Sequence, residues 1–396
     1  MRLSIQEASN PSTEFALFKF GFRPFFLMAS LYALISIFIW GGVYLHGWPI
    51  LGLPFTTMHW HAHEMIFGYG TAVAAGFLLT AVRNWTNLQT LQGYSLAGLS
   101  AIWLAARVVV WIIPGQILPM LIFDLVFDLW LIIGILRPIL RAKQYEQIGI
   151  VSKLILLMSA NLCFYLGVVG VFEQGIVWGL HSGLYILLAL VFTMARRVMP
   201  FFIERGVGYP VKLNNRVWID RSSLYLFVLF LIADVFWHNI PATVVLAGLL
   251  FTIHTIRLAG WYTKGIWNKP LLWVLYIGYC GAIFGFFLKA FTPFHLVVPS
   301  LPLHAFALGG IAMITIGMMA RISLAHTGRD IQKHSRLLAP AFISLFAAYI
   351  ARIVLPLIDS AHYLLWLGIT QAAWSISFAL FIWVYAPILV KPNADS

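Results

Sequence analysis

Apolar runs of about 20 residues recur along this chain, and they constrain its fold more than any other feature. A helix needs roughly 20 mostly apolar residues to cross the hydrocarbon core of a bilayer. Charged residues make up 10% of the chain, against about 25% in soluble domains. The sequence therefore predicts an all-α, polytopic membrane protein with 12 transmembrane helices. The predicted spans are about 24–45, 59–82, 92–113, 116–136, 151–172, 176–196, 222–238, 240–260, 270–290, 301–322, 337–357 and 361–388.

The connections between these runs are short. The longest, at about 196–222, is too short for a soluble domain, so residues 1–396 are expected to form a single integral membrane domain. No cleavable signal peptide is expected, because the first apolar run ends without a small-residue cleavage site. Cys163 and Cys280 both lie inside apolar runs, which argues against a disulfide framework and against a cysteine metal cage.

The formal net charge of +12 could suggest a nucleic-acid partner until the cations are located. With the N-terminus in the cytoplasm, all of the 25 Lys and Arg residues except Arg107, Lys289 and Arg352 fall at inner helix ends, in inner loops or in the two tails. This is the positive-inside pattern of membrane proteins. It places both termini in the cytoplasm and explains the basic charge without a nucleic acid.

Histidine has the opposite distribution, since most of the 12 histidines map to outer loops or outer helix ends. This distribution suggests a site near the outer surface, because titratable groups in membrane segments are usually functional. An interfacial role, in positions where lysine is avoided, stays open for His46, His295 and His362.

Similar features recur in order at about one third of the chain length. The second run of each third has a histidine near its outer start and ends in TAVR, TMAR or MMAR. The third run of each carries a charged residue at a matching place: Arg107, Asp234 and Arg352. We therefore expect three four-helix units around a pseudo-threefold axis, with repeats at 20–141, 150–260 and 268–390.

The segment HWHAHE at 59–64 gathers titratable groups at the start of an apolar run. His59 and His63 share a helix face, whereas His61 points roughly the opposite way. One helix could therefore offer imidazole ligands, which suit haem iron, copper and zinc, to two different sites. Glu64 could orient an imidazole, relay protons or pair with Arg107, because a buried carboxylate is costly unless it is paired or protonated. A purely structural hydrogen-bonded cluster is the alternative.

Small residues follow these histidines. Gly68, Gly70 and Gly76 allow close helix packing or leave room for a flat macrocycle, and close packing is the favoured reading. Gly309 and Gly310 follow His304 in the same way, and there the pattern suggests open space beside a ligand.

His181 and Tyr185 are one helical turn apart, as a metal-bound imidazole and a phenol that supplies a proton or an electron would be. An interfacial belt of Trp and Tyr is the alternative.

Asp124 and Asp128 are also one turn apart, near the middle of a span. Ion pairing with Arg107 or Arg352 is favoured over a proton path. The two arginines could instead hold the propionates of a haem.

The segments FGFRPFF at 20–26, 61–85, RRV with PFF at 196–202, and MARISLAHTGR at 319–329 resemble the NnrS family. The resemblance implies a multi-pass protein of the bacterial inner membrane with about 12 spans, associated with a haem, of the b type, and with copper. It also implies a role in the response to nitric oxide, in denitrification and in resistance to nitrosative stress.

A more remote similarity is to subunit I of the haem–copper oxidases, which has 12 helices in three units. It implies His61 and His304 as axial haem ligands, with His63 as a further candidate, and His181 as a copper ligand. The oxidase's paired histidines on its seventh helix are missing here, and its second ligand on the tenth helix falls at Pro302. His59 and His63 could substitute, which makes His59, His63, His181 and His304 the candidate metal ligands.

The sequence leaves three functions open. The first is a haem- and metal-binding membrane protein that binds or handles nitric oxide, or a similar small ligand, near the periplasmic side without full oxidase chemistry. The second is a haem–copper-type reductase of nitric oxide or oxygen, whose electron donor the sequence does not identify. The third is a transporter of copper, haem or a small anion.

Overall fold

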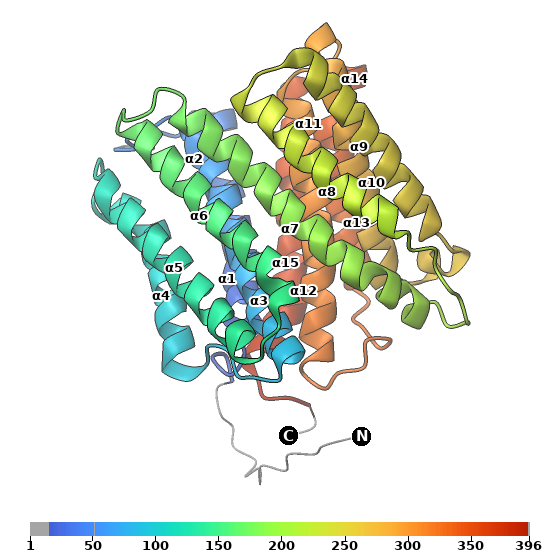
Figure 1. The fold of residues 1–396 in the computed structure, drawn as a ribbon. Coiled ribbons are helices and arrows are strands. Elements are labelled where there is room, and N and C mark those ends of the chain that lie inside the picture. The colour runs from blue at the N-terminus through green and yellow to red at the C-terminus, as the bar shows by residue number, and fades with distance from the viewer. Residues whose placement is uncertain (1–15, 51, 395–396) are drawn as a thin grey trace.

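The computed structural model describes residues 16–50 and 52–394, and every regular element in these ranges is a helix (Figure 1). The all-α prediction is confirmed. The elements are α1 (Phe22–His46), α2 (Thr57–His63), η1 (Glu64–Gly70), α3 (Thr71–Thr86), α4 (Gly93–Ile112), α5 (Ile117–Arg141), η2 (Tyr145–Gln147), α6 (Ile148–Val168), α7 (Gly175–Gly206), α8 (Val217–Leu231), η3 (Ile232–Phe236), α9 (Ile240–Gly260), η4 (Lys264–Asn268), α10 (Pro270–Phe291), η5 (Thr292–Phe294), α11 (Ser300–His304), η6 (Ala305–Met313), α12 (Ile314–Ala325), α13 (Leu338–Tyr349), η7 (Ile350–Val354), α14 (Leu355–Ile358) and α15 (Tyr363–Val390).

Eleven helices of the described chain are long and apolar enough to cross a membrane. The remaining predicted span, the seventh, at 222–238, corresponds to α8 and η3, which carry Asp220, Arg221 and Asp234. The predicted end of the sixth span at 196 is wrong, because α7 continues through Pro200 to Gly206. The longest predicted connection is correspondingly shorter.

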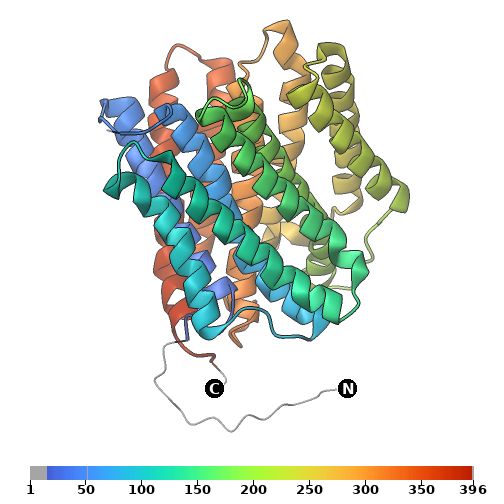
Figure 2. The same ribbon diagram turned by 60° about the vertical axis from the view of Figure 1, so that its left-hand side comes forward.

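The successive spans run in alternate directions, as Figures 1 and 2 show. The start of α1 and the end of α15 lie together, where the backbone N–H of Ala16 donates to the carbonyl of Val390 at 3.0 Å. We call this side of the bundle the terminal face and the other side the far face. The spans α2–η1–α3 and α11–η6–α12 both begin at the far face.

Three spans form the centre of the bundle: α2–η1–α3, α7 and α11–η6–α12. In their most apolar windows, 83%, 72% and 83% of the residues are buried. They contact one another, since α7 packs against η1, η6 and α12, and α12 packs against α3. Around them, α5 packs against α6, α9 against α10, and α15 against α1.

Close packing accounts for the small residues of the central spans. A Cβ atom added to Gly70 would lie 2.3 Å from Leu187, and one added to Gly76 would lie 2.8 Å from Phe26. The favoured close-packing interpretation of the glycines after His63 is confirmed. The open space expected beside Gly309 is absent, because a Cβ atom there would lie 2.8 Å from the backbone of Gly281 in α10.

Four π-helical segments interrupt the described spans: η1, η3, η6 and η7. A π-helical turn inserts an extra residue into the helix and is frequent at functional sites. η1 directly follows His63, and η6 directly follows His304. η3 contains Asp234 and η7 contains Arg352. His63, Asp234, His304 and Arg352 therefore lie in or next to segments where the helical register changes.

Candidate functional site

His61 and His63 lie on one short helix, but the structure places their rings in two separate clusters. His61 faces Trp40 of α1, and the two rings stack with centroids 4.6 Å apart and planes 8° from parallel. His63 faces the other way, toward Phe164 and Tyr165 of α6. This arrangement agrees with the helical spacing, which predicts that His61 and His63 point to roughly opposite sides of the helix.

The ring of His304, from α11, lies beside the ring of His61. Their centroids are 6.5 Å apart and their planes are 16° from parallel. The Nδ1–H of His304 donates to the backbone carbonyl of Ser300 at 2.7 Å, which leaves the lone pair on Nε2. A histidine that donates one ring N–H to a carbonyl in this way is oriented as metal-bound histidines usually are. We call these two residues the His61–His304 pair.

Arg352, in η7, completes this cluster. Its Nη2 lies 3.3 Å from Nδ1 and 3.4 Å from Nε2 of His304. Two buried nitrogen atoms here have no hydrogen-bond partner, Nδ1 of His61 and Nη1 of Arg352. Buried polar atoms are nearly always paired, so two unpaired nitrogens in one cluster point to a missing ligand.

The centroid separation of the pair can be compared with that of two imidazoles that share a metal ion. Metal–nitrogen bonds of about 2.0–2.1 Å place the centroids of two opposed, coordinated imidazoles roughly 6.3 Å apart. The observed 6.5 Å is close to this value. His61 and His304 are therefore the two candidate ligands that the structure brings together across separate spans.

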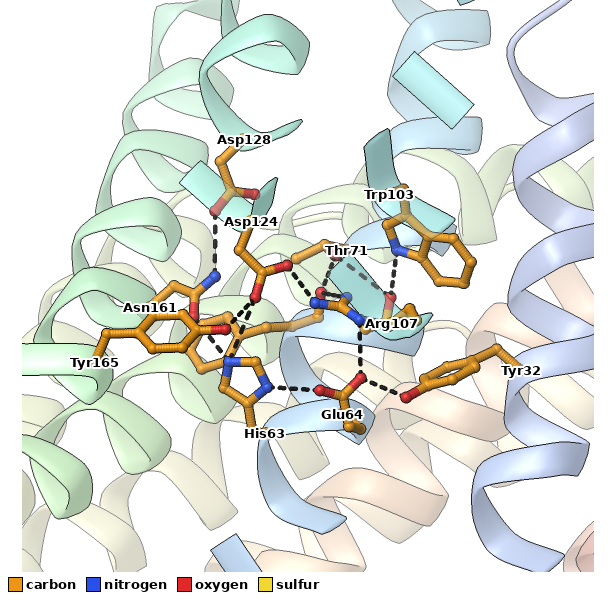
Figure 3. Close-up of polar contacts among 12 residues, drawn as sticks. Tyr32, His63, Glu64, Thr71, Trp103, Arg107, Asp124, Asp128, Asn161 and Tyr165 are labelled. Atoms are coloured by element: carbon orange, nitrogen blue, oxygen red, sulfur yellow. Dashed lines mark hydrogen bonds and ion pairs between the residues drawn. The ribbon is translucent and has the colours of Figure 1, made fainter. Parts of the chain in front are cut away.

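The second cluster, which we call the His63 network, joins α1, α2, η1, α4, α5 and α6 (Figure 3). Its centre is Arg107, whose Nε lies 2.9 Å from Glu64 and whose Nη2 pairs with Asp124. The same guanidinium donates to the carbonyl of Phe67 at 3.1 Å. The expected pairing of Asp124 and of Glu64 with Arg107 is present. The further members are Tyr32, His63, Asp128, Asn161 and Tyr165.

His63 has both ring nitrogens engaged in this network. Nδ1 lies 2.9 Å from Glu64 Oε1, and Nε2 lies 3.0 Å from Asn161 Oδ1. Asn161 donates its amide to Asp128, so its carbonyl oxygen is the atom that faces the ring. Both ring nitrogens of His63 are therefore occupied by polar contacts, and neither is free for a metal ion while these contacts hold.

His181 lies in a third cluster. Its Nδ1–H donates to the carbonyl of Val177 at 2.9 Å. Tyr185, one turn further on, donates to Asp234 at 2.7 Å rather than to His181, and Asp234 pairs with Lys289 at 2.8 Å. Within the described residues, no group of three or more His, Cys, Asp or Glu side chains could hold a metal ion. The structure thus does not gather His59, His63, His181 and His304 around one site.

The model of the NnrS protein family matches residues 16–393. This chain belongs to the NnrS family. The resemblance seen in the sequence is therefore confirmed over nearly the whole chain, and membership supports a membrane protein of the nitric oxide response. No curated protein matches the chain.

In this NnrS family member, the three exceptions to the positive-inside pattern all lie in the buried clusters. Arg107 pairs with Glu64, Lys289 with Asp234, and Arg352 contacts His304. Burial of a cation in a span is costly unless it is paired, and these three have partners there. Asp234 also accepts a hydrogen bond from Tyr185. In every predicted repeat, the charged residue of the repeat's third span therefore contacts its second span.

Several partners in these clusters were not found from the sequence. Tyr32, Trp40 and Tyr165 look like ordinary residues of apolar runs. Asn161 did offer a signal, because an amide in the middle of a span needs a hydrogen-bond partner. Lys289 offered another as an exception to the positive-inside pattern.

Outside the spans, His362 is an exposed residue beside a carboxylate. Its ring lies 2.7 Å from the carboxylate of Asp359, and its side chain is 65% exposed. This hydrogen bond lowers the pKa of the Asp359 carboxyl group. His362 provides a matched control for the buried histidines.

Proposed function

We propose that this protein binds a haem through His61 and His304 and uses it to bind nitric oxide. The observation that carries the proposal is the His61–His304 pair: two imidazoles from different spans, at 6.5 Å, beside two unpartnered buried nitrogens. A haem held there would supply an iron, and because both histidines would fill its remaining ligand positions, nitric oxide would bind in place of one of them. Nitric oxide is small, neutral and soluble in lipid, so it can reach a buried site from the bilayer.

The residues around the pair fit this role. Ser300 orients the His304 ring so that its lone pair is on Nε2, which Arg352 Nη2 approaches at 3.4 Å, and Trp40 stacks on the ring of His61. Arg352 has an unpartnered Nη1, which suits a haem propionate because arginine binds carboxylates through paired donors. Arg107 is already bound to Glu64 and Asp124, so we assign the propionate role to Arg352 alone.

A copper site is less well supported. Copper in proteins takes several histidine or sulfur ligands, and the described residues contain no group of three ligands. We therefore assign no role to copper.

The proposal places the site near the periplasmic side of a bacterial inner membrane. The far face is proposed to be periplasmic because the cations are concentrated at the terminal face, in accordance with the positive-inside pattern. Since α2 and α11 begin at the far face, the His61–His304 pair would lie close to the periplasm, with both termini in the cytoplasm.

We also propose that the bundle is built from three four-helix units around a pseudo-threefold axis. Three contacts support it, since the last helix of each unit packs against the first helix of the next: α5 on α6, α9 on α10, and α15 on α1. The second span of each unit lies at the centre.

A reductase is the second candidate function, and the His63 network favours it. A reductase needs a proton path, and Glu64, Asp124 and Asp128 form a buried series of carboxylates across α2–η1 and α5. Anaerobic consumption of nitric oxide by the purified protein with a reduced quinone or cytochrome would distinguish the two functions. A rate no faster than that of free haem would exclude the reductase.

Haem binding is tested on the purified protein, produced in cells that make haem. We expect a Soret absorption band, iron in proportion to the protein by elemental analysis, and a shift of the band on anaerobic addition of nitric oxide. Purified, folded protein with neither the band nor iron would contradict the proposal.

A further inference from the structure

A basic pocket opens at the terminal face. It lies at the opposite end of the span α11–η6–α12 from His304, and so far from the His61–His304 pair. It lies between the end of α7, the start of α10, the end of α12 and the segment 326–334, and its volume, including its mouth, is about 1160 Å³. We call it the basic pocket. The charged and titratable residues that line it are Arg205, Lys269, Arg321, Arg329, Asp330 and His334.

The charges of the basic pocket are unbalanced. Four of the lining residues are Lys or Arg, against the single carboxylate of Asp330. That carboxylate accepts from the backbone N–H of Gln332 at 2.8 Å. None of the four cations has an ion pair among the described residues. The pocket is therefore complementary to an anion.

Arg321 is the residue that most clearly needs a ligand. It is 8% exposed, and its guanidinium lies 3.9 Å from the ring centroid of Phe202. Its side chain makes no hydrogen bond or ion pair to any described residue, although a guanidinium carries five N–H donors. A buried, unpaired cation is costly, and Arg321 lines the pocket. An oxyanion in the pocket would pair with it.

The apolar side of the pocket indicates where that anion comes from. Phe201, in the lining, is 53% exposed, and Leu271 and Leu272 lie beside it. The pocket therefore combines cations with an apolar wall at the end of three spans. Basic pockets between spans bind the headgroups of anionic lipids, and arginine matches the geometry of phosphate oxygens.

We propose that the basic pocket binds a phosphate group, supplied by the headgroup of an anionic phospholipid of the surrounding membrane leaflet. Arg321 binds the phosphate oxygens from within, while Lys269 and Arg205 bind from the rim. The acyl chains then lie along the wall that contains Phe201. This site is independent of the haem, so its failure would leave the proposed function unaffected.

The test adds phosphatidylglycerol or phosphatidylcholine to the delipidated, full-length protein and measures lipid binding by native mass spectrometry. Both headgroups contain a phosphate, but the quaternary ammonium of phosphatidylcholine would lie among four cations and one carboxylate. Like charges placed together at a binding site cost affinity, so we expect the wild type to bind phosphatidylglycerol at least about tenfold more tightly. Arg321→Gln should abolish this preference. Arg141→Gln, a change at an exposed arginine at the end of α5 on the same face, should retain it.

Two further arms make the result decisive. If Arg321→Gln does not fold, the double variant Arg205→Gln/Lys269→Gln replaces it, because both residues are less buried than Arg321; loss of the preference supports the site. Millimolar inorganic phosphate is added as a competitor, and displacement of the lipid by it would overturn the assignment to a lipid in favour of a soluble phosphate. A wild type without lipid preference, or a preference retained in the pocket variants, would also overturn the proposal.

Discussion

The imidazole rings of His61 and His304 lie 6.5 Å apart, centroid to centroid, although they belong to spans near opposite ends of the chain. Both spans begin at the far face, and in each a π-helical segment begins soon after the histidine. Contacts on both sides hold the pair, Trp40 against His61 and the Ser300 carbonyl against His304. The positions of these two rings are thus set by packing in both central spans.

Replacement of Arg352 tests whether it assists a cofactor. Arg352→Gln should lower the affinity for haem by about 10–100-fold, because groups that orient or neutralise a bound cofactor typically contribute this much. Arg352→Lys should lose less, since it keeps the charge. The measurement is a haem titration of the cofactor-free protein by absorbance. Equal haem affinity in the wild type and Arg352→Gln would show that Arg352 has no part in the site.

Replacement of Arg107 tests the His63 network as a structural element. Arg107→Met should destabilise the protein by about 3–5 kcal/mol, because it leaves two buried carboxylates without their cation. Unfolding in mixed micelles with increasing denaturing detergent measures the change. Adding Glu64→Gln and Asp124→Asn to the variant removes the uncompensated charges, so part of the stability should return. An Arg107→Met protein as stable as the wild type would be inconsistent with these ion pairs.

Replacement of His63 is expected to affect the protein differently from replacement of His61. His63→Gln should retain the haem spectrum, because both ring nitrogens of His63 are engaged by Glu64 and Asn161. It should lower stability through the lost buried hydrogen bonds, by about 1–3 kcal/mol. Absorbance and detergent unfolding of the same preparation report both quantities. Loss of the haem band with normal stability would instead make His63 a ligand.

Gly309 tests the close approach of η6 to α10. Gly309→Ala should destabilise the protein by about 1–3 kcal/mol, because overpacking forces the backbone to move, and the new Cβ atom would lie 2.8 Å from Gly281. It should also weaken haem binding, because His304 directly precedes η6. Gly248→Ala in α9 is the control, since nothing lies within 4 Å of its added Cβ atom. If both variants behave alike, the contact with Gly281 has no energetic role.

The spans could be predicted from the sequence because hydropathy and length alone determine them. The segment 222–238 was predicted from its apolar residues, and α8 with η3, which carries Asp220, Arg221 and Asp234, covers most of it. Spacing on a helix also separated His61 from His63, since that needs only 3.6 residues per turn. The positive-inside pattern set Arg107, Lys289 and Arg352 apart, and a carboxylate partner was predicted for Arg107.

The rest of the site depends on contacts between distant segments. The pairing of His61 with His304 requires α2 and α11 to lie side by side, which no local pattern specifies. Of the partners of His63, Glu64 is its neighbour in the chain, whereas Asn161, Phe164 and Tyr165 come from α6. The prediction of open space beside Gly309 was wrong for the same reason, because α10 occupies that space.

The central claim is tested most directly by the absorption spectra of purified His61→Ala and His304→Ala beside the wild type and His362→Ala. We predict that the wild type and His362→Ala, which lacks an exposed histidine, show the same Soret band. Either pair variant should lose the band or shift it to that of a haem with one protein ligand. Spectra of His61→Ala and His304→Ala identical to that of the wild type would contradict the account.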